Sequence, residues 1–190
     1  MKRSFDSRVD YSLLLPVFCL LVIGVVAIYI AVSHDYPNNV LPILGQQIAW
    51  ISLGLVIGFV VMFFNTEFLW KVTPYLYGLG LALMVLPLVF YNPNLVASTG
   101  AKNWVSIGGT TLFQPSEFMK ISYILMLARA IVRFTQKHKE WRRTIPLDFL
   151  LIGWMIAFTI PVLILLALQS DLGTALVFVA IFSGMVLLSG

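Results

Sequence analysis

The sequence has few charged residues and a single cysteine. Charged side chains make up 11% of its 190 residues, whereas soluble domains carry about 25%. Cys19 has no partner for an intrachain disulfide, which excludes a disulfide-stabilised scaffold. Internal repeats, low-complexity stretches, phosphate-binding glycine loops and clusters of metal-ligating residues are also missing. Nucleic acid is therefore not an expected partner, and nothing divides the chain into separate domains.

Apolar residues, by contrast, are abundant. They make up 60% of the chain, and its mean hydropathy is +0.96. A soluble fold cannot shield that much apolar surface from water, whereas about 20 apolar residues in a row span a bilayer. Within the hydrocarbon layer a single segment satisfies its backbone hydrogen bonds only as a helix. We therefore predict an all-α polytopic membrane protein, with residues 1–190 forming part of one transmembrane domain.

Six apolar segments are candidates for spanning helices. They run from about Tyr11 to Val32, Ile43 to Phe64, Thr73 to Phe90, Pro115 to Val132, Leu147 to Leu168, and from Leu172 onward. The first segment follows basic residues, as a signal peptide does, but its apolar core is too long for one, so we expect a retained helix. The sixth is still apolar at Gly190, so we expect the chain to end inside a span and to be a fragment.

Lysine and arginine predict the orientation of these spans. The N-terminal tail, the turn Asn65–Val72 and the link Arg133–Pro146 together contain nine of them, whereas the connections on the other side contain only Lys102. The positive-inside rule then places the N-terminus and the basic link in the cytoplasm. We interpret the basic link as a topology signal that also contacts anionic membrane lipids.

Charged residues inside the spans are rare, and three of them lie in the fourth segment. Pro115 is well suited to begin a helix, which places Ser116 and Glu117 in its first turn. Lys120 follows Glu117 by three residues, so the two share a helix face and can form an ion pair. The pair is either a local feature of a capped helix or the charged wall of a polar cavity. We expect Arg129, near the cytoplasmic end, to extend to the membrane surface.

Asp171 lies in the short connection before the last segment. It can cap the sixth helix, with Gly173 allowing the tight turn between the spans. The predicted topology also places Glu117, Lys120 and Asp171 toward the same, outer side of the membrane. A shared cavity or mouth is the alternative interpretation.

The outer connection Tyr91–Gln114 is long and almost uncharged. Its glycines Gly100, Gly108 and Gly109 predict turns. Trp104 is expected either to anchor the connection in the membrane interface or to contribute to a substrate site. Lys102 either steers an anionic headgroup or is simply solvated.

Three motifs in this part of the chain resemble those of a known family. They are GAKNW (Gly100–Trp104), FQPSEFMKI (Phe113–Ile121) and QSDLGTA (Gln169–Ala175). Their order, spacing and topological placement resemble the SEDS family of bacterial cell-wall polymerases, and the elongation member more than the division member. The resemblance spans the whole chain but only about the first half of a family member.

The resemblance implies a function. SEDS proteins have about ten spans in the bacterial cytoplasmic membrane and polymerise lipid II into peptidoglycan strands on its outer face. They work with a class B penicillin-binding protein, and their essential catalytic Asp would lie beyond Gly190, so we expect this chain alone to be inactive. No cofactor is implied firmly, and a divalent metal is a candidate. The rival functions are a flippase or transporter of the lipid-linked precursor and a non-catalytic scaffold of the cell-wall synthesis complex.

The resemblance also selects residues. Glu117, Lys120 and Asp171 match family positions that line the central cavity, and Gln114, Pro115 and Ser116 match further motif positions of less defined role. The chain departs from the family at two places. Asn103 stands where Arg is usual, which weakens a pyrophosphate-binding role for that position. Ser170 stands where Pro is usual, and we expect this change to matter little.

Overall fold

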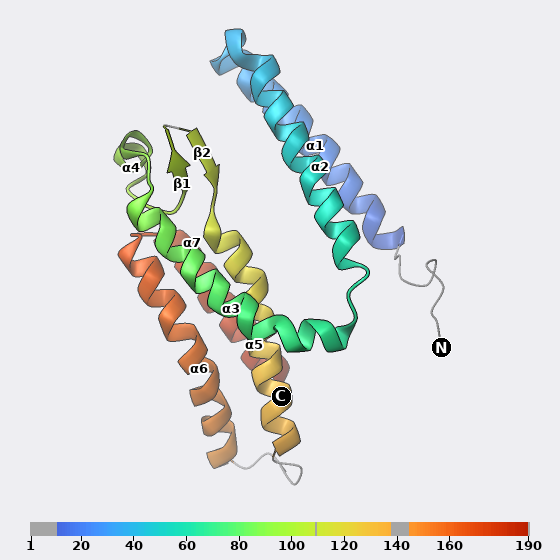
Figure 1. Cartoon of the computed structure of the whole chain (residues 1–190), viewed down its shortest axis with the longest axis vertical. Helices are drawn as coiled ribbons and strands as arrows, with labels where there is room; N and C mark the ends of the chain where they lie inside the picture. The colour runs from blue at the N-terminus through green and yellow to red at the C-terminus, as the bar shows by residue number, and fades with distance from the viewer. Residues whose placement is uncertain (1–10, 109, 138–144, 190) are drawn as a thin grey trace. The chain divides into compact units, whose positions relative to one another are not determined.

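The computed structural model describes residues 11–108, 110–137 and 145–189, which belong to two compact units, Met1–Asn65 and Thr66–Gly190 (Figure 1). The first unit contains α1 (Tyr11–Asp35), the short 3-10 helix η2 (Pro37–Asn39) and α2 (Val40–Val61). The two long helices pack together as a hairpin. Both are apolar around their whole circumference, and α2 has no buried residue. Such helices suit a lipid environment rather than water.

The second unit is built around one central helix. It contains the helices and strands α3 (Thr66–Val89), α4 (Pro93–Thr99), β1 (Val105–Ile107), β2 (Thr110–Phe113), α5 (Pro115–Lys137), α6 (Ile145–Leu168) and α7 (Leu172–Ser189). α5 contacts α3, α6 and α7, and its buried face forms the middle of the core. Met119, Tyr123 and Leu127 on α5 are fully buried, as are Met84 on α3 and Phe178 on α7.

Two buried tyrosines link the helices through hydrogen bonds. The Tyr77 hydroxyl on α3 donates to the carbonyl oxygen of Phe158 on α6 at 2.6 Å. The Tyr123 hydroxyl on α5 lies 2.7 Å from Oγ1 of Thr159, and that Thr hydroxyl donates to Met155 O. Because Thr159 has only one hydroxyl proton, Tyr123 is the donor in the first of these bonds. Each buried hydroxyl therefore has a hydrogen-bond partner in the apolar core, where an unpaired hydroxyl would be costly.

The predicted helices are all present. Five of them, α1, α2, α3, α6 and α7, are long and apolar enough to cross a membrane. This confirms an all-α polytopic membrane architecture. α5 is not among the five because it carries five charged residues, Glu117, Lys120, Arg129, Arg133 and Lys137. The count of six spans therefore stays a prediction. The same holds for the cytoplasmic N-terminus and for the single domain.

The largest differences from the predicted helix bounds are in α3 and α5. α3 begins at Thr66, so Lys71 lies in the helix and not in a turn. α5 continues to Lys137, which places Arg133 on the helix instead of in the link. Neither extension contains Gly or Pro, so nothing interrupts the helix where the chain becomes polar. Most of the remaining basic link lies outside the described residues.

The outer connection is more ordered than predicted. It contains α4 and an antiparallel hairpin of β1 and β2, which an all-α description omits. The backbone N–H of Ser106 donates to Phe90 O at 2.9 Å and so attaches the hairpin to the end of α3. Gly100 and Gly108 have positive φ angles of 76° and 60°, as the predicted turns require. Gly109 lies outside the described residues.

α3 and α5 approach closely at Gly80. A Cβ atom there would lie 2.5 Å from Sδ of Met119 and 3.0 Å from Oγ of Ser122. Met119 is fully buried, so it has little room to move. Gly78, two residues earlier on α3, has open space at the same position.

We predict that Gly80→Val lowers the free energy of unfolding by about 1–3 kcal/mol, because the added carbons overpack the α3–α5 contact. Gly78→Val is the matched control and should change it by less than about 0.5 kcal/mol. Thermal unfolding of the complete protein in detergent measures both. Equal shifts in the two variants would contradict a close contact at Gly80.

Candidate functional site

The connection between α6 and α7 is a tight corner held from several sides. The backbone N–H of Asp171 donates to Leu166 O at 3.0 Å. The Gln169 side chain is buried and donates to the carbonyl oxygen of Met84 on α3. The backbone N–H of Lys102, in the outer connection, donates to Gln169 O at 2.8 Å. Segments far apart in the sequence therefore meet here.

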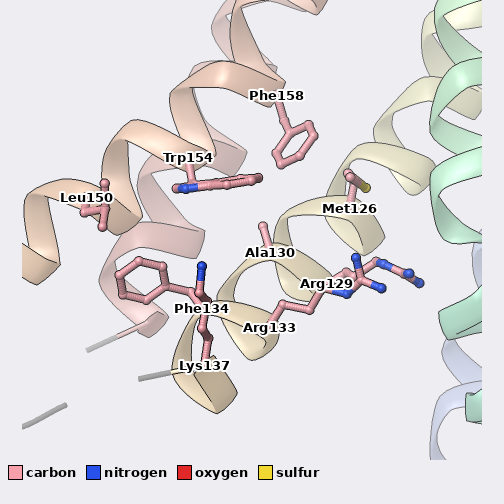
Figure 2. A pocket seen from close by; sticks show the side chains of 9 residues that line it. All are labelled: Met126, Arg129, Ala130, Arg133, Phe134, Lys137, Leu150, Trp154 and Phe158. Atoms are coloured by element: carbon pink, nitrogen blue, oxygen red, sulfur yellow. The ribbon is translucent and has the colours of Figure 1, made fainter. Parts of the chain in front are cut away.

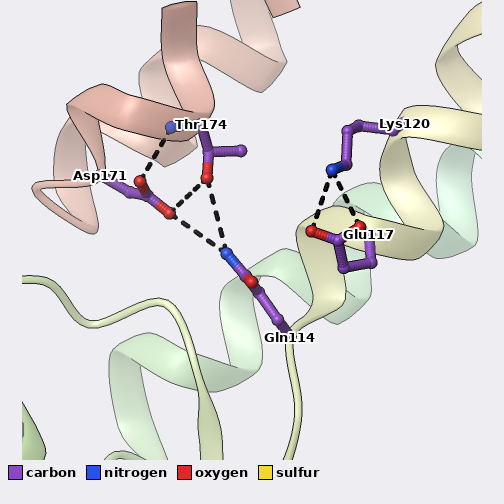
Figure 3. A network of polar contacts seen from close by, with 5 residues as sticks. All are labelled: Gln114, Glu117, Lys120, Asp171 and Thr174. Carbon is purple, nitrogen blue, oxygen red and sulfur yellow. Dashed lines mark hydrogen bonds and ion pairs between the residues drawn. The ribbon is translucent and has the colours of Figure 1, made fainter. Parts of the chain in front are cut away.

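The Asp171 carboxylate is the centre of this corner. Its Oδ1 accepts the backbone N–H of Thr174 at 3.0 Å, which is the N-cap contact that the sequence predicted for the last helix. Its Oδ2 accepts from Thr174 Oγ1 at 2.7 Å and from Asn103 Nδ2 at 2.8 Å. Nε2 of Gln114, just before α5, lies farther away at 3.4 Å (Figure 3). Asp171 thus connects α7, the start of α5 and the outer connection.

Asp171 is buried and yet stays ionised. It is 8% exposed. Burial raises its pKa, but the hydrogen bonds from Thr174, Asn103 and Gln114 lower it more, and the net pKa lies below its ordinary value. All its described partners are neutral, and the only ion pair among the described residues lies elsewhere. The corner therefore holds a negative charge that hydrogen bonds stabilise and that forms no ion pair within the described ranges.

That ion pair joins Lys120 and Glu117, as their spacing predicted. Nζ of Lys120 lies 2.8 Å from Oε2 of Glu117. The Glu117 side chain is 62% exposed and that of Lys120 is 27% exposed. Figure 3 shows the pair on the first turns of α5, with no contact drawn to Asp171. The structure thus brings Gln114 to Asp171 and keeps Glu117 with Lys120, and a cavity shared by all of them stays a prediction.

The other candidate residues occupy separate environments. Ser116 is 1% exposed, and its Oγ has no hydrogen-bond partner among the described residues. The Lys102 ammonium lies 4.6 Å from the ring centroid of Tyr91, a cation–π contact. Trp104 is partly exposed where the hairpin begins. None of the three has a side-chain hydrogen bond to Asp171 in the described part of the chain.

Arg129 does not follow its prediction. The residue is 8% exposed, and its guanidinium lies 5.2 Å from the ring centroid of Trp70 on α3. The aromatic face attracts the cation and keeps it within the helix bundle. The expected extension to the membrane surface was therefore wrong.

Sequence reasoning missed two partners of Asp171. Thr174 could have been found, because a hydroxyl residue three positions after an N-cap lies beside the capping group. Asn103 could not, because 68 residues separate it from Asp171 and only the fold brings them together. It had been noted merely as a departure from a family pattern.

The tight turn also uses a different residue than predicted. Gly173 lies in the helix, whereas Ser170 has a φ of 57°, the left-handed conformation. A proline ring fixes φ near −65° and cannot adopt this conformation. The replacement of the family's usual Pro by Ser at this position therefore changes the backbone that the corner can adopt, contrary to our expectation that it matters little.

Long apolar helices with a small polar cluster at one end define the chain as a polytopic helical membrane protein. A family model described as "Cell cycle protein", covering FtsW, RodA and SpoVE, matches residues 11–190, and the chain belongs to this family. The match confirms the resemblance to SEDS proteins.

Relatives with known names agree. The chain is 29% identical to the peptidoglycan glycosyltransferase RodA of Treponema pallidum over 97% of this chain and 39% of that protein. It is 30% identical to the peptidoglycan glycosyltransferase MrdB of Escherichia coli K12 over 92% of this chain and 43% of that protein. A chain of the solved structure "Structural coordination of polymerization and crosslinking by a peptidoglycan synthase complex" has a TM-score of 0.63 and 30% identity, covering 90% of this chain and 44% of its own. The chain thus spans less than half the length of these relatives.

We predict that Thr174→Val lowers the free energy of unfolding by about 1.5–3 kcal/mol near neutral pH, because a carboxylate loses a short hydrogen bond. Thr135→Val is the control, since Thr135 is exposed and its hydroxyl donates to the carbonyl oxygen of Ile131 on the same helix. Folding lowers the pKa of Asp171, so its ionised side chain stabilises the folded state at any pH above the ordinary pKa of 3.8. This stabilisation is lost as the pH falls through the pKa of the folded state. The difference between wild type and Thr174→Val should therefore shrink in acid, and a pH-independent difference in thermal unfolding would argue against it.

We predict that Ser170→Gly raises the free energy of unfolding by about 1 kcal/mol, because glycine adopts a positive φ without steric cost. Ser170→Pro should lower it, since proline excludes this φ and removes the N–H that donates to Ala167 O. Ser183→Gly in the interior of α7 is the control and should be destabilising. If Ser170→Gly is also destabilising in the same unfolding assay, the left-handed conformation is not present in solution.

Proposed function

We propose that this chain is the N-terminal part of a bacterial cell-wall polymerase that joins lipid II into peptidoglycan strands during cell elongation and shape maintenance. The observation that carries the proposal is the family match over residues 11–190, together with relatives named as peptidoglycan glycosyltransferases. Relatives named FtsW match at a similar level, so the elongation role rests on the motif resemblance. The protein would work in the bacterial cytoplasmic membrane as a multi-pass enzyme.

The Asp171 corner and the Glu117–Lys120 ion pair are the parts of this chain that we assign to the polymerase site. An acceptor sugar hydroxyl would attack the anomeric carbon of a second lipid-linked sugar, and undecaprenyl pyrophosphate would leave. The general base would be an Asp beyond Gly190, as the family resemblance implies. Lys120 would offset charge on the pyrophosphate, held in position by its 2.8 Å contact with Glu117. Asp171 would hold the outer connection and the start of α5 in register.

A metal and a partner protein belong to the same proposal. A divalent metal would help to neutralise the pyrophosphate, but the described residues contain no group of three His, Cys, Asp or Glu that could hold one. A class B penicillin-binding protein is the proposed partner, which is supported by the likeness to a chain of a peptidoglycan synthase complex.

We predict that Asp171→Asn in the complete protein reduces glycan polymerisation by about tenfold or more. The variant keeps the side-chain size but weakens the acceptor that links α7 to Asn103 and Gln114 of the outer connection, and small displacements of this kind are costly in catalysis. Polymer formed from lipid II in vesicles containing the protein and its partner is the measurement. Asp148→Asn, in the first turn of α6, is the matched control and should stay active.

The outcomes separate the competing functions. Full polymerisation by Asp171→Asn, present at normal level in the membrane, would leave Asp171 only its capping role. If the unmodified complete protein moves lipid II between leaflets without forming polymer, the flippase function is favoured. Normal growth of cells carrying Glu117→Ala with Asp171→Ala would favour a scaffold.

A further inference from the structure

A cavity lies at the other end of the bundle, far along α5 from Asp171. It has a volume of about 300 Å³ and is formed between the C-terminal half of α5 and the N-terminal half of α6 (Figure 2). The α6 wall includes Leu150, Trp154 and Phe158, and the α5 wall includes Phe134 and Lys137. No candidate residue for the polymerase site lines it.

One side of the cavity is aromatic and accessible. Trp154 is 55% exposed, and its ring centroid lies 6.2 Å from that of Phe158. Phe134 faces them from α5 and is itself nearly buried (Figure 2). Trp154 and Phe158 lie within the candidate span Asp148–Leu168, so an open aromatic surface at this place fits the acyl chain of a lipid.

The cavity is also cationic. Arg129, Arg133 and Lys137 line it, and no carboxylate is among its described lining residues. Figure 2 shows the Lys137 side chain extending past Phe134 toward Trp154, whereas the two arginines extend to the other side of α5. Nη1 of Arg129 is buried and has no hydrogen-bond acceptor among the described residues. Such a donor calls for an oxygen acceptor from outside the described chain.

We propose that this cavity binds an anionic phospholipid, with its phosphate at Lys137 and an acyl chain against Trp154 and Phe158. The aromatic wall favours a lipid over a free phosphate, which would leave that wall uncovered. The excess of cations favours an anionic over a zwitterionic headgroup. The predicted orientation places the site in the cytoplasmic leaflet. The proposal depends on membrane insertion of α5 and α6 and not on the proposed polymerase activity.

The test uses the complete protein purified from membranes in mild detergent. Native mass spectrometry measures how much phosphatidylglycerol and phosphatidylcholine stay bound at equal concentrations. Lys137→Gln should lower the retained phosphatidylglycerol about fivefold, the effect of one cation near a lipid headgroup. Trp154→Ala should lower it as well, and Lys137→Arg should restore it.

Lys71→Gln is the matched control, because it removes one exposed cation on the same predicted side without lining the cavity. Equal loss of lipid in Lys71→Gln and Lys137→Gln would overturn the proposal in favour of general surface charge. Equal retention of the two lipids by the unmodified protein would also overturn it. If millimolar inorganic phosphate displaces phosphatidylglycerol, the cavity is a site for a free anion and the lipid proposal is overturned. An unchanged thermal midpoint in Lys137→Gln confirms that the lipid loss does not come from unfolding.

Discussion

The polar end of the second unit depends on one buried negative charge. The Asp171 carboxylate accepts hydrogen bonds from α7, from the outer connection and, at longer range, from the residue before α5. A buried carboxylate without such donors would take up a proton or force the corner open, because an unpaired charge is costly away from water. The donors come from α7 and from two places in the outer connection, Asn103 and Gln114, and each of them lowers the pKa of Asp171. The tight corner, the docked hairpin and the start of α5 are therefore coupled.

The sequence was sufficient for the long helices and for contacts within one helix. Apolar runs of about 20 residues have essentially one solution in a membrane, and an i, i+3 pair such as Glu117 and Lys120 is determined by helix geometry alone. The Asp171 cap is local in the same sense. Helix ends were less accurate, because polar residues near Lys71 and Arg133 continue a helix without any sign in the hydropathy.

What could not be predicted depends on distant parts of the chain meeting. Strands of three and four residues, such as Val105–Ile107, are too short to show an alternating pattern, and their pairing is decided by docking on α3. Asn103 reaches Asp171 only after the outer connection folds back over the α6–α7 corner. Arg129 was expected at the surface because it lies near the cytoplasmic end of its predicted span, whereas the Trp70 ring provides a buried alternative.

The charges of α5 are distributed in the way that its own dipole favours. Its first turn carries Glu117, and its last turns carry Arg133 and Lys137. A helix stabilises negative charge at its N-terminus and positive charge at its C-terminus. The positive-inside rule also favours basic residues at the C-terminal end of α5 when that end faces the cytoplasm. Reversal of the helix in the membrane would move the basic end to the outer side, so the same residues that give α5 its weak hydropathy also favour a single orientation. The Glu117–Lys120 ion pair at one end and the basic cavity at the other thus lie on one helix whose positive charge increases toward its C-terminus.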